Sequence, residues 1–205
     1  MHILVTGASS GVGFACARLL KQQGHTVTKW SSAECDFNYP DKIFNHDLSG
    51  YNMIINCAGH GHGHNHNFFT NTWQNQLSQV MVNYVSNIFL YKHYVNSVST
   101  GRYVWVGSRL TACPNSKPHQ AVYTTTKSAS AITIESANQD QSHVSTLEIM
   151  LGLTRSNFRY RSQSGTTTQQ EIEQMWDSQG AINSDQAASR IIEAAFSDCK
   201  KILIE

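Results

Sequence analysis

Short apolar runs alternate along the chain with longer segments in which apolar residues recur every three or four positions. Runs of about four to eight residues rich in branched side chains are typical of buried strands, and the longer period is typical of helices with one buried face. The predicted strands are residues 2–6, 26–30, 33–37, 52–56, 103–107, 144–151 and 201–204. The predicted helices are residues 12–20, 77–98, the segment that contains 123–134, and 187–196, with at most a stub of helix at 39–46.

Strands that alternate with helices favour a parallel sheet covered by helices on both faces. We therefore expect an α/β protein with a doubly wound sheet of about seven strands. The 205 residues are enough for one well-buried domain and few for two, and no internal repeat or linker interrupts them. Residues 1–205 are accordingly expected to form a single domain.

A glycine-rich turn joins the first predicted strand to the first predicted helix. Its glycines are Gly7, Gly11 and Gly13, spaced as G-x-x-x-G-x-G. At such a turn backbone N–H groups point outward, the helix dipole favours an anion, and glycines let the backbone approach a ligand closely. We therefore expect the turn to bind a phosphate group, although its spacing differs from G-x-G-x-x-G.

A tyrosine and a lysine stand four positions apart on the helix that contains residues 123–134. Residues at this spacing share one face of a helix, so the Tyr123 phenol and the Lys127 ammonium are expected to lie side by side. A nearby cation lowers the pKa of a phenol from its usual value of about 10 and brings it closer to acid–base work. Ser108 follows the strand at 103–107 and lies at the sheet edge where open α/β sheets bind ligands. The Tyr–Lys spacing is also common on exposed helices and does not establish a site by itself.

The composition argues against several classes of function. Charged residues make up 14% of the chain and the formal net charge is +1, unlike a nucleic-acid-binding surface or a basic membrane helix. No apolar run approaches the roughly 20 residues of a membrane span, and no secretory signal is visible. Five scattered cysteines without a C-x-x-C pattern fit a reducing compartment. We expect a soluble cytoplasmic protein without nucleic-acid or membrane partners.

Several segments match the motifs of one family in the right order. Residues 6–13 read T-G-x-x-x-G-x-G, residues 56–59 read N-C-A-G, and residues 123–127 read Y-x-x-x-K with Ser108 before them. The chain thereby resembles the short-chain dehydrogenase/reductase family over nearly its whole length, and this resemblance implies an NAD(P)-binding Rossmann fold.

Two further matches and several departures belong to the same resemblance. Asn83 falls where the family keeps an asparagine on the long helix, and residues 151–156 resemble P-G-x-V-x-T. Cys57 and Leu151 stand where the family has asparagine and proline, and Ser156 stands in the threonine place. The gap from the serine to the tyrosine is about one or two residues longer than is typical.

The resemblance implies an enzyme that transfers a hydride between NADP(H) or NAD(H) and a carbonyl or alcohol of a small substrate. Tyr123 would exchange a proton with the substrate oxygen as general acid and base, and Ser108 would hydrogen-bond that oxygen. Lys127 would lower the Tyr123 pKa and hold the nicotinamide ribose, and Asn83 would anchor a water that relays protons. The residues expected to bind the cofactor are Thr6, Gly7, Ser9, Ser10, Gly11, Val12, Gly13, Ser31, Asp36, Phe37, Asn56, Ala58, Gly59, Tyr123, Lys127, Gly152, Thr154 and Ser156.

The end of the second strand bears on the choice of cofactor. NAD-specific proteins on this fold carry an acidic residue there, and here the place falls at Trp30, Ser31 or Ser32. We therefore expect NADP(H) to be preferred, with NAD(H) as the alternative, because serine hydroxyls and Lys29 can donate to a 2′-phosphate. Lys29 can instead point to the other face of the sheet, and Ser10 stands where NADP-binding relatives often carry a basic residue. With the serines alone the preference would be slight.

Residues 156–184 lie where the family usually places a substrate lid. The segment Thr168–Glu171 has a capping-box pattern, and Ile172, Met175 and Trp176 then share one helix face. We expect a short helix that either closes over the cofactor or packs permanently on the core. Nothing in this segment names a substrate.

Four histidines stand at alternate positions in residues 60–66. Imidazoles at this spacing can bind zinc or nickel. The loop itself contains no acidic residue or cysteine, and glycines separate most of the histidines. We therefore expect a polar loop near the mouth of the active site rather than a metal site.

The helix over residues 77–98 carries more apolar positions than one sheet contact needs, among them Phe89, Tyr91, Tyr94 and Val95. Family members pair through this helix and the Tyr123 helix, so the resemblance implies a homodimer or homotetramer.

Two other functions remain open. A non-catalytic dinucleotide sensor can share the fold, although it would not need Asn83, Ser108, Tyr123 and Lys127 together. An epimerase or dehydratase of the extended relatives would use a larger substrate domain than 205 residues allow.

Overall fold

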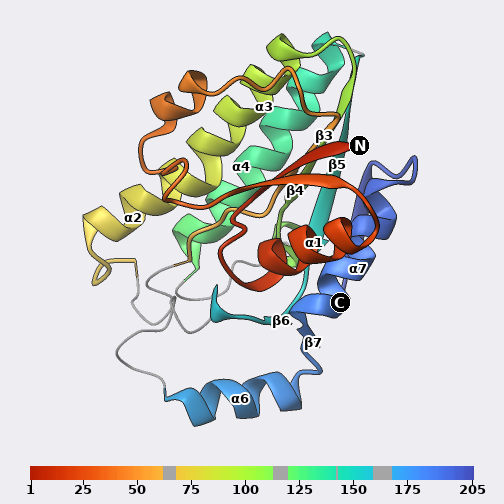
Figure 1. The fold of residues 1–205 in the computed structure, drawn as a ribbon. Coiled ribbons are helices and arrows are strands. Elements are labelled where there is room, and N and C mark those ends of the chain that lie inside the picture. Colours follow the sequence, from red (N-terminus) through yellow and green to blue (C-terminus); the bar gives the residue numbers. More distant parts are fainter. Residues whose placement is uncertain (62–67, 113–119, 142, 159–167) are drawn as a thin grey trace.

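The computed structural model describes residues 1–61, 68–112, 120–141, 143–158 and 168–205. Six strands of this part form one parallel sheet in the order β2-β1-β3-β4-β5-β8 (Figure 1). The direction of winding reverses between β1 and β3, which is where ligands bind in doubly wound sheets. The strands are β1 His2–Thr6, β2 Thr26–Trp30, β3 Met53–Asn56, β4 Gly101–Val106, β5 Val144–Leu151 and β8 Lys201–Ile204.

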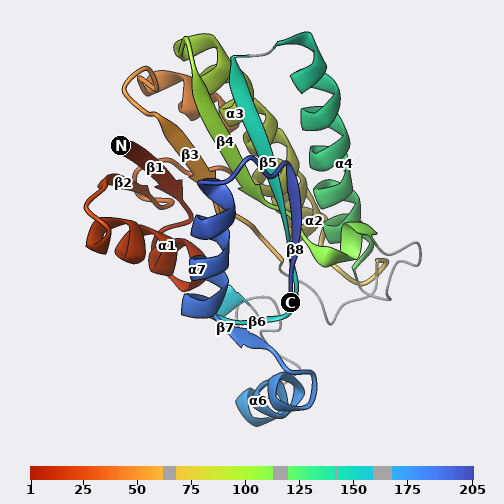
Figure 2. The same ribbon diagram turned by 90° about the vertical axis from the view of Figure 1, so that its right-hand side faces the viewer.

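Helices cover both faces of this sheet (Figure 2). One face is covered by α1 (Gly11–Gln22) and α7 (Ser184–Ala195), and the other by α3 (Ser86–Ser97) and α4 (Ala121–Ala137). Side chains alternate between the faces along each strand. Ile3 and Val5 therefore pack in the core beneath α1 and α7, whereas Leu4 packs in the core on the opposite face. The predicted doubly wound α/β fold is confirmed.

Residues 33–37 contain turns and no strand, so the prediction of a strand there is wrong. Glu34 Oε2 accepts hydrogen bonds from the N–H and the hydroxyl of Ser31, at 2.7 and 2.6 Å. The N–H of Cys35 donates to the Ser31 carbonyl at 3.0 Å. These local bonds satisfy the chain without a neighbouring strand. Cys35 and Phe37 are nevertheless buried, which accounts for the apolar pattern.

The helix predicted over residues 77–98 is interrupted by a turn of π-helix. Its parts are α2 Trp73–Val80, the π-helical turn η2 Met81–Val85, and α3. Within the π turn, the Asn83 carbonyl accepts a hydrogen bond from the Ser130 hydroxyl of α4 at 2.8 Å. Such turns inside α-helices occur frequently at functional sites.

A smaller layer lies beyond the carboxyl ends of the main strands. β6 (Thr154–Arg155) and β7 (Ile182–Asn183) pair in parallel, and α6 (Gln169–Ser178) lies away from the main sheet (Figure 1). Thr168 and Glu171 form the predicted reciprocal capping box. Three short 3-10 turns also belong to the described part of the chain: η1 Pro40–Asn45, η3 Arg109–Ala112 and η4 Asn138–Asp140.

Two residues that were expected to add to an outer apolar surface belong to the core. Tyr91 and Tyr94 are buried, and their ring centroids lie 5.2 and 6.4 Å from that of Tyr103. Leu77 on α2 and Ile132 on α4 are exposed instead. Phe89 and Val95, the other two residues of that prediction, are half-buried, and the expected pairing stays a prediction.

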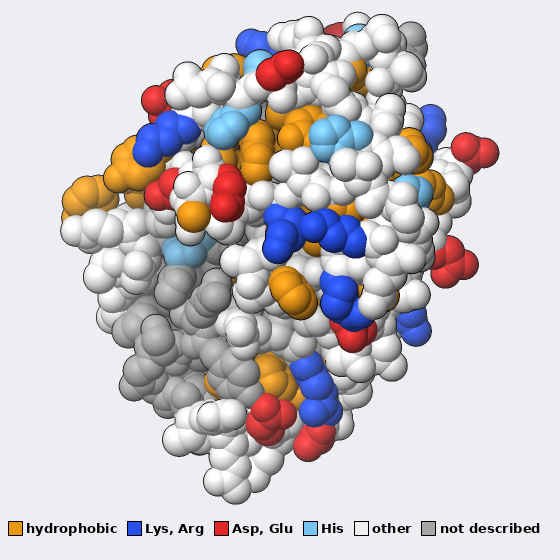
Figure 3. Space-filling model, viewed as in Figure 1, with side chains coloured by type: hydrophobic (Ala, Val, Ile, Leu, Met, Phe, Trp, Pro, Cys, Tyr) orange, Lys and Arg blue, Asp and Glu red, His pale blue; other side chains and the backbone are white. Residues whose placement is uncertain are grey.

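The surface carries charges of both signs. On the face shown in Figure 3, acidic and basic side chains are scattered among uncharged ones. No helix in the described ranges is both long enough and apolar enough to span a membrane.

Candidate active site

A cleft crosses the carboxyl ends of the strands. Its larger cavity, about 380 Å³, is lined by residues that follow β1, β3, β4 and β5 and by residues of α4 and α6. Its smaller cavity, about 170 Å³, is lined by residues that follow β1, β2 and β3. Gly7, Ser9 and Gly59 line both, so the two cavities are adjoining parts of one cleft.

The glycine turn forms the floor of this cleft. Gly7 has a φ of 63°, and a Cβ there would lie 2.8 Å from the nitrogen of Ala58 and the carbonyl oxygen of Cys57. A Cβ on Gly13 would collide with the carbonyl oxygen of Gly7. Ser10 is the N-cap of α1, and its side chain makes no capping bond with the described residues. The first N–H groups of α1 are thus left for an anionic ligand, as a pyrophosphate requires.

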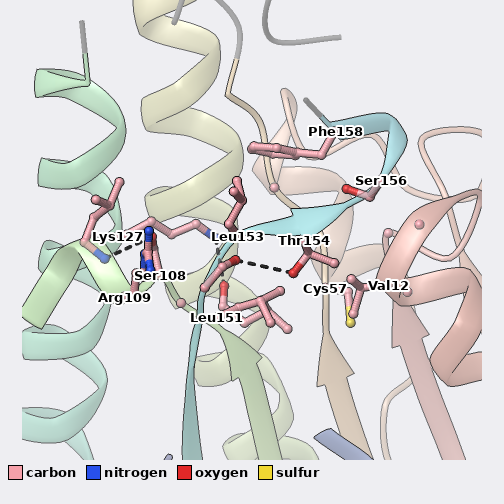
Figure 4. Close-up of a pocket in the computed structure, with 18 of the residues that line it drawn as sticks. Val12, Cys57, Ser108, Arg109, Lys127, Leu151, Leu153, Thr154, Ser156 and Phe158 are labelled. Atoms are coloured by element: carbon pink, nitrogen blue, oxygen red, sulfur yellow. Dashed lines mark hydrogen bonds between the residues drawn. The ribbon is translucent and has the colours of Figure 1, made fainter. Parts of the chain in front are cut away.

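The segment after β5 comes close to the same turn. A Cβ on Gly11 would lie 3.2 Å from the Cβ of Ser156. The Thr154 hydroxyl donates to the Gly152 carbonyl at 3.3 Å, and Figure 4 shows Thr154 and Ser156 at the edge of the larger cavity. The glycine turn and the segment after β5, which are far apart in the sequence, therefore lie side by side at the cavity.

Ser108 and Lys127 meet at the end of β4. Ser108 is 6% exposed, and its Oγ accepts a hydrogen bond from the N–H of Leu110 at 3.3 Å. The Lys127 Nζ donates to the Val106 carbonyl at 2.8 Å. Figure 4 shows the lysine head beside the strand end that carries Ser108.

Tyr123 lies one helical turn before Lys127 and lines the same cavity. Its ring centroid is 6.1 Å from that of Phe158, at an interplanar angle of 56°. A Cβ on Gly59 would lie 3.5 Å from Lys127 Nζ, 3.7 Å from Asn83 Oδ1 and 3.8 Å from the Phe158 ring. Gly59 is therefore the point at which these side chains converge.

The electrostatics of Lys127 depend on its burial. Burial lowers the pKa of Lys127 from 10.5 to about 8, although Cys57 and Glu148 act in the opposite direction. At this pKa the lysine is still mostly charged at neutral pH. A cation in a buried site favours the phenolate form of a neighbouring tyrosine.

Asn83 and Asn56 lie behind the wall of the cleft and line neither cavity. The Asn83 amide accepts from the His60 N–H and donates to the His60 carbonyl, both at 2.7 Å, and also donates to Thr126 at 3.3 Å. Asn56 Oδ1 accepts from the Thr6 hydroxyl and from the Ala58 N–H. Both asparagines therefore hold the backbone on either side of Gly59.

The smaller cavity is lined by the predicted residues Ser31, Asp36 and Phe37. The carboxylate of Glu34 binds Ser31, and hydrogen bonds from the Ser31 hydroxyl and then from its N–H lower the pKa of Glu34. A negative charge therefore stands beside Ser31. Lys29 is exposed on β2 and does not line this cavity.

Met175 of helix α6 and Gln179, which directly follows the helix, line the larger cavity. Arg155 of β6 connects this strand to α6 through ion pairs with Glu173, at 3.7 Å, and with Asp177. Ile172 and Trp176 are buried. The lid predicted over 156–184 stays a prediction, and its residues 159–167 lie outside the described ranges.

Residues 3–179 match the model of the NAD dependent epimerase/dehydratase family. The chain belongs to this family. Among curated proteins, none matches the sequence. The predicted relationship to the short-chain dehydrogenases is confirmed by this match and by the shared fold of the solved structures described next.

Three of these solved structures illustrate the shared fold. The ligand-free aldohexose dehydrogenase of Thermoplasma acidophilum has a TM-score of 0.79 and 17% identity, over 98% of this chain and 92% of its own. A small-chain dehydrogenase in complex with NADPH has a TM-score of 0.84 and 14% identity, over 100% and 96%. The closed form of serine dehydrogenase complexed with NADP+ has a TM-score of 0.84 and 15% identity, over 100% and 94%.

Most residues that the family resemblance singled out line the cleft of this member. The larger cavity contains the predicted residues Gly7, Ser9, Ser10, Gly11, Val12, Gly13, Gly59, Ser108, Tyr123, Lys127, Gly152, Thr154 and Ser156. The smaller cavity adds Thr6, Ser31, Asp36, Phe37 and Ala58. Their roles in this family member stay predictions.

Several lining residues were missed by the sequence reasoning. Arg109 directly follows Ser108 and lines the larger cavity, and Phe158 faces Tyr123. Their only sequence signal was closeness to a motif. Glu34 carried no signal, because its contact with Ser31 depends on a turn that was read as a strand.

The histidine loop lies mostly outside the described residues. His60 and Gly61 are described, and residues 62–66 are not. Among the described residues, no group of three or more histidine, cysteine or acidic side chains is placed to hold a metal ion. The expectation for this loop stays a prediction.

Proposed function

We propose that the protein is an NAD(P)-dependent oxidoreductase of the short-chain dehydrogenase type, acting on a carbonyl or alcohol of a small substrate. The observation that carries this proposal is that Ser108, Tyr123 and Lys127 line one cavity that adjoins the glycine turn. Family membership supports a nicotinamide cofactor. The solved neighbours described as dehydrogenases with NADPH or NADP+ support the reaction class.

The cleft fits a dinucleotide. The glycine turn and the N-terminus of α1 would hold the pyrophosphate, where a Cβ on Gly7 or Gly13 has no room. Thr154, Ser156 and Lys127 would hold the nicotinamide half in the larger cavity, and Ser31 and Asp36 the adenosine half in the smaller one.

The nicotinamide would supply or accept the hydride when bound. In reduction the Tyr123 hydroxyl donates its proton to the substrate carbonyl oxygen, and in oxidation it takes the proton back. The Ser108 hydroxyl donates a hydrogen bond to the same oxygen and holds it in line. The Lys127 ammonium stabilises the Tyr123 phenolate.

Asn83 has a supporting part in this proposal. Both hydrogens of its amide are used by the His60 carbonyl and Thr126, so it fixes the loop after β3. The second lone pair of Oδ1 remains to accept from a water that relays protons.

NADP(H) is the preferred cofactor in this proposal, by a small margin. Ser31 and Ser32 line the smaller cavity where an acidic residue would favour NAD(H). Lys29 does not line the cavity, and the Glu34 carboxylate beside Ser31 opposes a 2′-phosphate. Comparing the dissociation constants of NADPH and NADH at one ionic strength tests this preference, and tighter NADH binding would refute it.

The homodimer or homotetramer expected from the family remains part of the proposal. Leu77 on α2 and Ile132 on α4 are exposed apolar residues on helices that contact each other. Light scattering at micromolar concentration should give a mass of at least two 22.9 kDa chains. A mass of one chain would contradict the proposed assembly.

The function is tested by titrating the protein with NADPH and NADH and then screening small ketones and aldehydes at fixed NADPH. A dehydrogenase consumes one NADPH for each carbonyl reduced. The family description also makes an epimerase or dehydratase a second candidate, which would change its substrate without net consumption of the cofactor. Tight cofactor binding without turnover of any kind would instead support a sensor.

A further inference from the structure

A carboxylate is buried in the middle of β5. Glu148 is 4% exposed in a strand whose neighbouring residues Leu147 and Ile149 are core aliphatics. Burying a charge is costly unless it is paired. Glu148 Oε2 accepts from Lys201 Nζ at 2.9 Å, from its register partner on β8. Glu148 Oε1 has no hydrogen-bond partner among the described residues.

The unpaired oxygen lies against the strand end that carries the candidate active site. A Cβ built on Gly107 would be 3.1 Å from Glu148 Oε1. Gly107 stands between Val106, whose carbonyl binds Lys127, and Ser108. Leu147 and Ile149 belong to the core beneath α1 and α7, so Glu148 points to the opposite face of the sheet, where α4 lies.

In the part of the chain that the structure describes, Glu148 is the carboxylate whose charge acts on the pKa of Lys127. Arg109 is turned toward the C-terminal residue, with its Nη1 3.5 Å from Glu205. Cys57 and Glu148 both oppose the effect of burial on the pKa of Lys127, and of the two only Glu148 is already held as an ion pair. Among the described residues, the titratable side chains that line the cavity with Lys127 or act on its pKa are Cys57, Arg109, Tyr123 and Glu148, and those of the adjoining smaller cavity are Cys35, Asp36 and His60.

We propose that Glu148 is a positioning residue for the reaction: its buried carboxylate keeps the Lys127 ammonium charged, and through Lys127 it sets the pH range in which Tyr123 exchanges its proton. This inference rests on the proposed function. The ion pair with Lys201 holds Glu148 in place from the edge of the sheet, and its unpaired oxygen lies against Gly107, next to the Val106 carbonyl that binds Lys127.

The sign of the effect separates this role from a packing role. Removing the Glu148 charge makes Lys127 and Tyr123 release their protons at lower pH. Carbonyl reduction needs Tyr123 protonated and Lys127 charged. Without the Glu148 charge, the alkaline limb of the pH profile of kcat therefore moves to lower pH. Removing the Lys201 charge leaves the negative charge of Glu148 without its ion-pair partner, so the alkaline limb moves to higher pH. If the ion pair served only packing, its loss in either variant would have the same effect.

The test compares Glu148→Gln, Glu148→Asp and Lys201→Gln. The kcat for NADPH-dependent reduction of a carbonyl found in the screen is measured from about pH 6 to 10. We expect the alkaline limb to move to lower pH by about one unit in Glu148→Gln and to higher pH in Lys201→Gln. In Glu148→Asp, which keeps the charge, the limb should lie close to its position in the unmodified protein. An unmoved limb in Glu148→Gln, or a downward shift in Lys201→Gln, would overturn the inference.

A second readout does not depend on turnover. The protein is labelled with ¹³C-lysine, and the Lys127 Cε signal, assigned by its loss in Lys127→Met, is titrated. Its midpoint should fall in Glu148→Gln and rise in Lys201→Gln, and equal midpoints would overturn the inference. If no carbonyl is turned over, the proposed function fails while this titration still decides the role of Glu148. If Glu148→Gln does not fold, the direction of the Lys201→Gln shift decides it.

Discussion

The two cavities of the cleft are held together in different ways. At the larger cavity, Lys127 of α4 bonds the Val106 carbonyl at the end of β4, a half-buried contact between residues far apart in the sequence. In the turn after β2 that lines the smaller cavity, Ser31 bonds Glu34 and Asp36 bonds Asn38, and these contacts between close neighbours are exposed. The position of Lys127 therefore depends on the packing of α4 against the sheet, whereas the turn after β2 is held by its own side chains.

This difference suggests how each cavity responds to change. A substitution in the larger cavity alters a buried network in which each group supports the others, so its effect should be large. A substitution in the turn of the smaller cavity alters exposed charges that solvent and salt screen, so its effect should be small. The reaction should accordingly be harder to alter than the cofactor preference.

The largest effect is expected for Tyr123→Phe in the larger cavity. The change removes the hydroxyl and keeps the ring that packs against Phe158, so turnover should fall about 100- to 10,000-fold while NADPH binding stays nearly unchanged. Steady-state kinetics and a cofactor titration measure the two effects. Tyr84→Phe is the matched control, because Tyr84 bonds Thr133 outside both cavities. Wild-type turnover in Tyr123→Phe would refute the role of Tyr123.

The floor shared by the two cavities is tested by Gly7→Ala. Its new Cβ would meet the backbone of residues 57 and 58, and its φ of 63° is unfavourable for alanine. We expect a loss of about 2–5 kcal/mol in the free energy of unfolding and loss of cofactor binding. Gly24→Ala carries the same kind of backbone strain at a φ of 85° with no atom within 4 Å of its Cβ. It should lose only about 1–2 kcal/mol in urea denaturation, and equal losses in the two variants would contradict the steric argument.

The burial of Lys127 predicts a pH dependence of stability. The pKa of Lys127 is lowered from 10.5 to about 8 in the folded protein, so between these values the unfolded chain binds more protons than the folded one. The free energy of unfolding should therefore rise with pH from about 8 to 10.5, by at most about 3 kcal/mol, relative to Lys127→Met. Below pH 8 the cost of burying the charge is fully present. Parallel stability curves for the two proteins would show that Lys127 is not desolvated as the structure indicates.

The smallest effect is expected at the smaller cavity, for Glu34→Gln. Removing the charge beside Ser31 should tighten NADPH binding relative to NADH by about two- to fivefold at low salt, and less at high salt. Asp47→Asn is the control for the charge change, because Asp47 caps Ser49 away from both cavities. A ratio that does not change in Glu34→Gln would show that Glu34 has no part in cofactor preference.

The sequence by itself was sufficient for the sheet, the main helices and the glycine turn. Buried parallel strands must be apolar and helices must repeat every three or four residues, so β5 and β8 were predicted with the bounds that the structure has. The motif residues were found because their spacing repeats that of a known family. Residues 33–37 were misread, because two buried side chains in a turn give the same apolar pattern as a short strand.

Only the tertiary structure decided which side chains meet. No sequence pattern singled out Glu148 within the correctly predicted strand β5. Its position against Gly107 depends on the register between β4 and β5. Glu34 lies beside Ser31 of the smaller cavity because its own side chain closes the turn. The Asn83 carbonyl in the π turn accepts a hydrogen bond from Ser130, on a helix many residues later in the chain. Local preference and periodicity determine the elements, but contacts across the sheet and between helices determine the electrostatics of the site, because charge and burial act through space and not along the chain.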